Sequence, residues 1–168
     1  MATNPLKRVI VIAIILLCCI GCDQATKQIA RQSLPQFQVI RLFHDTIRLQ
    51  YTENRGGFLS LGAGIPEMAR YWIFTILVGL FLAGLFIFLV ITKRLGNQQF
   101  LALSLVLAGG LSNWLDRILH GGWVVDFLNL GLGNWRTGVF NVADLAIMLG
   151  VIWLAGAALR DSLHHRRS

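Results

Sequence analysis

The chain has 168 residues, of which 55% are hydrophobic and 14% charged, and its mean hydropathy is +0.64. This composition is too apolar for an ordinary soluble domain and predicts a protein that is solvated by lipid. The net charge of +7 would suit nucleic acid, but the basic residues stand beside the apolar runs, so we expect membrane topology to explain them and no nucleic-acid partner.

The first apolar run covers residues 9–22 and is short for a membrane core about 30 Å thick, so we expect its helix to continue through the polar residues Asp23–Lys27. The run also resembles a lipoprotein signal peptide that is cleaved between Gly21 and Cys22. Cys19 stands where such peptides usually have leucine, and further apolar runs follow, so we expect the segment to remain as a helix. The three cysteines are confined to this run, which predicts neither a disulfide framework nor a metal site.

The next segment has the pattern of β-structure. Apolar and polar side chains alternate over residues 38–49, and the pattern extends toward residue 60 with a break at Gly56-Gly57. Pro66 is expected to open a short amphipathic helix. We therefore expect a small sheet and a helical flap over residues 36–70.

Three further apolar runs are long enough to cross a membrane. Residues 72–91 carry no charge, and runs starting at Phe100 and Phe140 are apolar except for polar residues near one end of each. The fold class is therefore an all-α polytopic membrane protein with a small extracytoplasmic β-sheet and a flap helix. We expect a single membrane-embedded domain, residues 1–168, with four transmembrane helices at approximately residues 8–28, 71–92, 99–118 and 140–160.

The basic residues that flank these runs fall on one side of a four-span topology. By the positive-inside rule this side is cytoplasmic, so both termini are expected in the cytoplasm, and residues 23–71 and 113–139 are expected to face outward. The polar residues at the helix ends then gather at the outer membrane surface. The basic residues are Lys7, Arg8, Lys93, Arg94, Arg160, Arg166 and Arg167.

Two aspartates stand in apolar surroundings with no basic residue close to them in the sequence. They are Asp126, within Trp123–Leu128, and Asp144, within Val139–Leu145. A charged group at membrane depth costs at least about 2.5 kcal/mol, so each is a functional candidate. The topology returns both to one surface, where two close carboxylates share a proton and can act as acid and base. The first turn of a helix favours the charged form, so we expect Asp144 to be the base; the alternative is that Asp144 caps its helix and Asp126 ends a strand.

Two further groups of polar residues lie at helical spacing. Asn113, Asp116 and Arg117 share one helix face, and Asp23 and Lys27 form an acid-to-base pair one turn apart. Each group either supports a site or merely anchors a helix end at the membrane interface. The sequence alone leaves both possibilities open.

Five short motifs follow one another along the chain. They are Asp23-Gln24-Ala25-Thr26-Lys27, Asn54-Arg55-Gly56-Gly57-Phe58, Asn113-Trp114-Leu115-Asp116-Arg117, Val124-Val125-Asp126-Phe127 and Phe140-Asn141-Val142-Ala143-Asp144. In this order, over nearly the whole chain, they resemble the motifs of the type II, or lipoprotein, signal peptidases. Ser112 and Gly57 depart from that family's usual glycine and alanine but keep a small side chain.

The resemblance implies an intramembrane aspartic endopeptidase with Asp126 and Asp144 as the catalytic pair. It would cut diacylglyceryl-modified prolipoproteins on the N-terminal side of the lipidated cysteine. It implies no cofactor or metal, membrane lipid as a partner, a monomer, and a site at the outer face of the bacterial inner membrane. The substrate-binding or supporting residues would be Asp23, Lys27, Asn54, Gly56, Asn113, Asp116, Arg117 and Asn141.

Other classes of function fit less well. A transporter or channel would need polar groups along the membrane helices, but residues 80–91 and 147–159 are apolar. A membrane scaffold with no catalytic activity would not explain why Asp126 and Asp144 stand unpaired in apolar segments. The chain has no order of residues typical of serine catalysis, and its histidines lack metal-ligand spacing.

Overall fold

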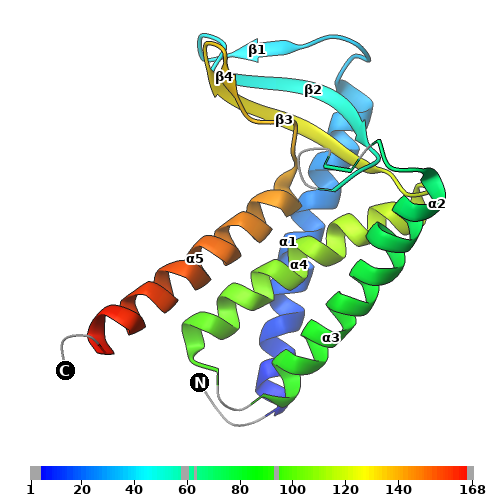
Figure 1. Cartoon of the computed structure of the whole chain (residues 1–168). Coiled ribbons are helices and arrows are strands. Elements are labelled where there is room, and N and C mark those ends of the chain that lie inside the picture. Colours follow the sequence, from blue (N-terminus) through cyan, green and yellow to red (C-terminus); the bar gives the residue numbers. More distant parts are fainter. Residues whose placement is uncertain (1–4, 58–60, 63, 93–94, 166–168) are drawn as a thin grey trace.

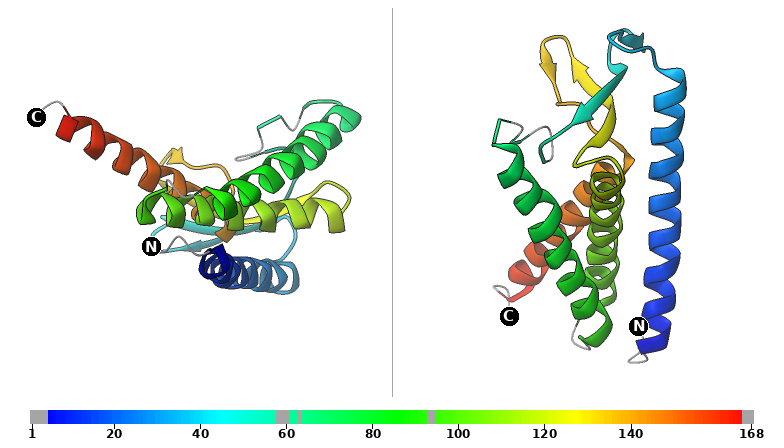
Figure 2. Two further views of the ribbon diagram at one scale, coloured as in Figure 1. Left: turned by 90° about the horizontal axis from the view of Figure 1, so that it is seen from below. Right: turned by 90° about the vertical axis from the view of Figure 1, so that its right-hand side faces the viewer.

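The computed structural model describes residues 5–57, 61–62, 64–92 and 95–165. Within these residues the chain forms four long helical stretches and a four-stranded sheet at one end of them (Figure 1). The start of the first helix and the end of the last helix both lie at the opposite end (Figure 2). The flanking basic residues Lys93, Arg94, Arg166 and Arg167, and Phe58 of the second motif, lie outside the described residues.

The first helix, α1 (Pro5–Ser33), extends well beyond its apolar run. Asp23 and Lys27 lie within it and are buried, while apolar side chains such as Leu17 are largely exposed. The expectation that the helix continues through its polar residues is confirmed. An exposed apolar surface of this kind is typical of a membrane-spanning helix.

The second stretch is continuous from Glu67 to Ile91. It comprises α2 (Glu67–Arg70), the π-helical η2 (Tyr71–Leu77) and α3 (Val78–Ile91). The short helix expected after Pro66 is present as α2, and it continues without a break into η2 and α3. No proline or glycine follows Arg70 before Gly79, so nothing interrupts the helix between them.

The third helix, α4 (Asn97–Leu119), packs against α1, α3 and the last helix, α5 (Val142–His165) (Figure 2). The apolar core joins Ile12 of α1, Leu82 and Leu89 of α3, and two residues of α4. Helix α4 approaches α5 closely at Gly150, where an added Cβ atom would lie 2.6 Å from the carbonyl oxygen of Ala102. Small residues allow this backbone approach between helices in lipid.

In the described part of the chain, three helices are long and apolar enough to cross a membrane: Pro5–Ser33, Glu67–Ile91 and Val142–Arg160. They correspond to three of the four spans that we expected. Helix α4 is less apolar because Asn113, Asp116 and Arg117 occupy its last turns. The helices therefore make this a multi-pass membrane protein, with α4 enclosed by the others.

The sheet has the strand order β1 (Ile40–Leu42), β2 (Ile47–Asn54), β3 (Val124–Leu132), β4 (Trp135–Arg136), with antiparallel pairs throughout. Strands β1 and β2 form in the segment expected to be β-structure. Strand β3 is new, because residues 113–139 were expected to be an outer, glycine-rich connection. Its end pairs with β4 inside that connection, and the part that carries Asp126 pairs with the distant strand β2, which sets Asp126 opposite Thr52.

We predict that Gly150→Ala lowers the thermal stability of the detergent-solubilised protein, whereas Gly156→Ala raises it slightly. Both substitutions gain helix propensity, by up to about 1 kcal/mol. The Cβ atom at position 156 meets no atom within 4 Å, but at position 150 it collides with the α4 backbone, at a cost of about 1–3 kcal/mol. Thermal unfolding of the two variants tests this packing, and equal melting temperatures would contradict it.

Candidate active site

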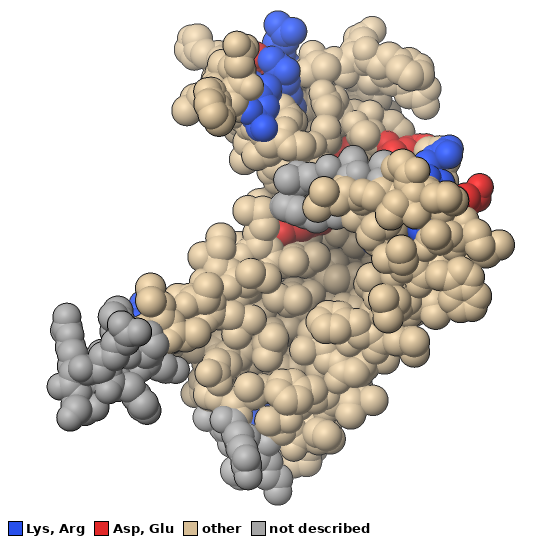
Figure 3. Space-filling view, viewed as in Figure 1, with Lys and Arg blue, Asp and Glu red and all other residues tan. Residues whose placement is uncertain are grey.

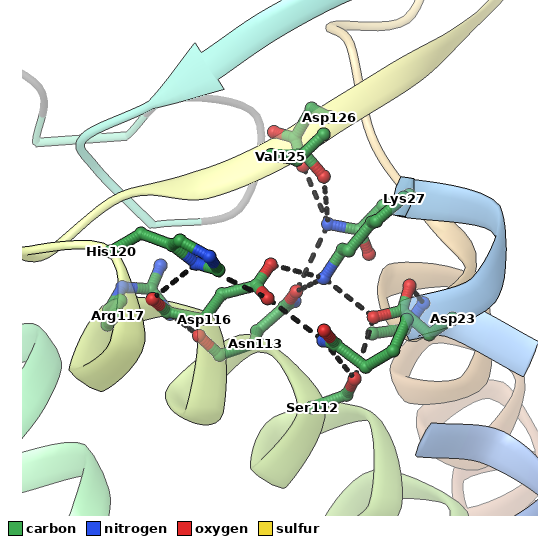
Figure 4. A network of polar contacts seen from close by, with 12 residues as sticks. Asp23, Lys27, Ser112, Asn113, Asp116, Arg117, His120, Val125 and Asp126 are labelled. Atoms are coloured by element: carbon green, nitrogen blue, oxygen red, sulfur yellow. Dashed lines mark hydrogen bonds and ion pairs between the residues drawn. The ribbon is translucent and has the colours of Figure 1, made fainter. Parts of the chain in front are cut away.

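A buried lysine lies at the centre of the polar residues near the sheet (Figure 4). The Nζ atom of Lys27 is 2.6 Å from Oδ2 of Asp23, 2.8 Å from Oδ2 of Asp116 and 2.9 Å from Oδ1 of Asn113. Lys27 is only 1% exposed, and both carboxylates are fully buried. The ammonium group therefore forms ion pairs with two carboxylates and donates a hydrogen bond to Asn113, so this buried charge is well paired.

The two carboxylates that pair with Lys27 also tie α1 to the other helices. Asp23 accepts hydrogen bonds from the Ser112 hydroxyl (2.7 Å) and from the backbone N–H of Ala143 (2.8 Å) in the first turn of α5. Asp116 accepts one from the Nε2 atom of Gln24 (2.9 Å). The carboxylate of Asp23 thus also meets the positive end of the α5 dipole.

Lys27 sets the orientation of the neighbouring amides. Its ammonium can only donate, so the Oδ1 atom of Asn113 faces Lys27, and the Nδ2 atom of Asn113 faces Asp144, to which it donates at 2.8 Å. The Oδ1 atom of Asn113 also accepts from the Nδ2 atom of Asn141 at 3.1 Å. Because each amide has one donor end and one acceptor end, fixing the first amide fixes the second.

Asn141 contacts both of the aspartates that the sequence singled out. Its Nδ2 atom donates to Oδ1 of Asp126 at 2.6 Å, and its backbone N–H donates to Oδ2 of Asp144 at 3.3 Å. Its Oδ1 atom accepts from the backbone N–H of Asp144 at 2.9 Å, which caps the start of α5. Asp144 therefore does cap its helix, as the alternative interpretation held, while it also lies beside Asp126, which is inside a strand and not at its end.

Asp126 is 1% exposed and lies on β3, outside the membrane helices. Burial raises the pKa of Asp126 from 3.8 to about 7, and the charge of Asp144 adds to the rise, while hydrogen bonds from Asn54 and Asn141 oppose it. The folded protein therefore holds this proton more tightly than the unfolded chain does. Its contribution to stability is present below about pH 4 and is lost as the pH rises toward 7.

The loop after β2 closes another side of the site. Asn54 donates from Nδ2 to Oδ2 of Asp126 (2.9 Å) and accepts at Oδ1 from the backbone N–H of Gly56 (2.8 Å). Arg117 donates from Nη2 to the carbonyl oxygen of Gly56 (2.8 Å), and its guanidinium lies 5.6 Å from the centre of the Phe74 ring. A Cβ atom at Gly57 would lie 3.0 Å from the same ring, so a small residue is needed there.

The structure brings all the residues expected at the site into one connected network of hydrogen bonds and ion pairs. It adds Ser112 and Gln24, which sequence reasoning did not select as site residues. Ser112 could have been selected from the sequence, because it lies one helical turn before Asp116 and so on the same face of the helix. In the described part of the chain, no group of three His, Cys, Asp or Glu side chains is arranged to hold a metal ion.

Known proteins are similar to this chain in both sequence and fold. The lipoprotein signal peptidase of Chlorobium phaeobacteroides is 37% identical over 144 residues, which cover 78% of this chain and 87% of that protein. The lipoprotein signal peptidase of Streptococcus pneumoniae is 30% identical over 159 residues, 95% of this chain and 99% of that protein. A solved bacterial membrane enzyme superposes with a TM-score of 0.78 at 26% identity and covers 90% of this chain and 89% of that structure.

A family model described as signal peptidase (SPase) II matches residues 14–160. This range contains the whole network around Lys27, Asp126 and Asp144. The chain therefore belongs to the signal peptidase II family.

Proposed function

We propose that this membrane peptidase is an aspartic endopeptidase. It removes the signal peptide of diacylglyceryl-modified prolipoproteins by cutting on the N-terminal side of the lipidated cysteine, with Asp126 and Asp144 as its catalytic residues. One observation carries the proposal. The two buried carboxylates contact one asparagine, Asn141, and within the described residues neither is paired with a cation.

The surroundings of the two carboxylates suit different roles. Asp144 lies in the first turn of α5 and accepts from a backbone N–H and from Asn113, which favours its ionised form. The pKa of about 7 keeps a proton on Asp126 in a large share of molecules at neutral pH. Asp144 can then take a proton from water while Asp126 hydrogen-bonds the scissile carbonyl oxygen.

The proposed reaction is the hydrolysis of one peptide bond. Water attacks the carbonyl carbon and gives one proton to Asp144, and the resulting tetrahedral intermediate collapses as the C–N bond breaks. The leaving amine, which becomes the α-amino group of the lipidated cysteine, takes up a proton from the aspartate pair. The signal peptide leaves with a new carboxyl terminus, and no metal or organic cofactor takes part.

The proposed membrane placement puts α4 as a fourth span beside the three apolar helices. Its 23 residues are about 35 Å long at 1.5 Å per residue. Both termini would then face the cytoplasm, and the sheet and the aspartates would lie at the outer face of the bacterial inner membrane. The chain would act there as a monomer, in contact with lipid along its exposed apolar side chains.

The distribution of buried polar residues argues against the transporter alternative. Most of them gather at the sheet end, and charged side chains lie mainly there on the face shown in Figure 3. Arg8, at the opposite end, is buried too, and it donates to the carbonyl oxygens of Leu89 and Thr92. Among the described residues of α4 between Asn97 and Ser112, the buried polar one is Ser104, whose hydroxyl donates to the carbonyl oxygen of Phe100. A cation path would need such groups through the whole bundle.

We predict that Asp126→Asn and Asp144→Asn each slow cleavage of a diacylglyceryl-modified prolipoprotein by about 10²–10⁴-fold, because each removes one of the two proton-transfer groups. The control is Asp45→Asn, since Asp45 lies at the surface of the sheet and bonds to Arg48. Rates are measured with purified enzyme in detergent, and melting temperatures verify folding. A near-normal rate for either folded active-site variant would refute the aspartic mechanism.

We predict that the cleavage rate falls as the pH rises above about 7. Deprotonation of Asp126, whose pKa is raised to about 7, leaves both aspartates ionised and removes the hydrogen-bond donor to the substrate carbonyl. The pH dependence of kcat/KM reports this as an apparent pKa of the pair. If the rate instead keeps increasing up to pH 9 in a protein that stays folded, Asp126 is not the acid.

We predict that Lys27→Met destabilises the protein by about 3–5 kcal/mol, because it leaves Asp23 and Asp116 buried without a cation. The added change Asp116→Asn removes one of these charges and should recover part of the loss. Denaturation in detergent of the single and double variants measures this coupling. Strictly additive losses would show that Lys27 and Asp116 act independently.

A further inference from the structure

A cavity adjoins the candidate active site at the sheet end of the molecule. Its volume is about 270 Å³, and it lies between the loop after β2, the α2–η2 helical stretch and the connection from α4 to β3. The side chains that matter here are those of Arg55, Glu67, Arg70, Phe74 and Trp123.

The cavity and the active site share a wall. Asn54 contacts Asp126, and the next residue, Arg55, lines the cavity. Phe74 also lines the cavity, and its ring lies against the guanidinium of Arg117, which holds the carbonyl oxygen of Gly56. A substrate chain bound at the aspartates would therefore lie next to this cavity.

The charge and the geometry of the cavity suit a carboxylate. The Arg55 guanidinium lies 3.8 Å from the centre of the Trp123 ring and stacks on it. Stacking holds the guanidinium plane and leaves the N–H groups at its edge available for bidentate bonding to a carboxylate. Arg70 adds a second positive charge, with one of its N–H groups bonded to the carbonyl oxygen of Ile65.

Glu67 limits the amount of negative charge that the basic cavity accepts. Two arginines and one glutamate line the cavity, so it favours a single negative charge and is less suited to a polyanion. The aromatic faces of Phe74 and Trp123 provide apolar contact for the stem of a side chain. A single acidic side chain fits these features.

We propose that this cavity binds an acidic side chain of the prolipoprotein in the few residues that follow the lipidated cysteine. The inference rests on the proposed function, because it takes the cleaved chain to leave at the sheet end while the signal helix lies along the membrane helices. The peptidase then favours substrates with Asp or Glu in these positions, and Arg55 determines the preference.

The test compares lipopeptides that share a signal sequence and a diacylglyceryl-modified cysteine and differ only in having Asp or Asn in the residues after the cysteine. We expect wild-type kcat/KM to be about fivefold higher for the Asp peptide, the upper range for a partly exposed ion pair. The ratio should fall to about one in Arg55→Gln, and Arg55→Glu should prefer a Lys peptide. The matched control is Arg41→Gln on β1, which should keep the wild-type ratio.

The outcomes separate this inference from the proposed function. If wild type cleaves neither peptide, the proposed function fails, and this inference fails with it. If wild type cleaves both peptides equally well, only the inference fails. If the rates depend on Arg55 equally for both peptides and only in vesicles that contain phosphatidylglycerol, a lipid headgroup occupies the cavity, and the inference is wrong.

Discussion

The buried ammonium group of Lys27 needs an acceptor for each of its protons, because an unpaired charge away from water costs several kcal/mol. Asp23 on α1 and Asp116 on α4 form ion pairs with this cation, and Asn113 on α4 accepts a hydrogen bond from it. The contact with Asn113 then fixes the direction of that amide, and through it the direction of the amide of Asn141. The hydrogen bonds from the Asn113 amide to Asp144 and from the Asn141 amide to Asp126 therefore follow from the placement of one cation.

The four buried aspartates of the site divide into two kinds. Asp23 and Asp116 are paired with a lysine, so they balance charge and join helices. Asp126 and Asp144 are surrounded by amide donors, and the pKa of Asp126 rises because burial and a neighbouring carboxylate both disfavour its ionised form. Residues of one chemical type thus suit structural or catalytic roles according to the charge of their neighbours.

The sheet positions Asp126, and the loop after β2 lies between the active site and the neighbouring cavity. Strand β3 is paired on one side with β2, whose last residue, Asn54, bonds directly to Asp126. The following loop is held by Arg117 on one side, while Arg55 faces the cavity that we propose for the substrate's acidic side chain. The same short segment therefore contacts the proposed catalytic residue Asp126 and also lines the cavity that we propose for substrate specificity.

The sequence alone determined the apolar helices and the candidate residues, because hydropathy and helical spacing are local properties and because an acid in an apolar run is costly wherever it lies. Asp126 and Asp144 could be selected in this way. Only the tertiary structure decided that Val124–Leu132 is a strand, that the turn after Pro66 begins a long helix, and that Ser112 and Gln24 join the network. Strand pairing, helix contacts and amide orientation depend on partners far away in the sequence, which no local pattern specifies.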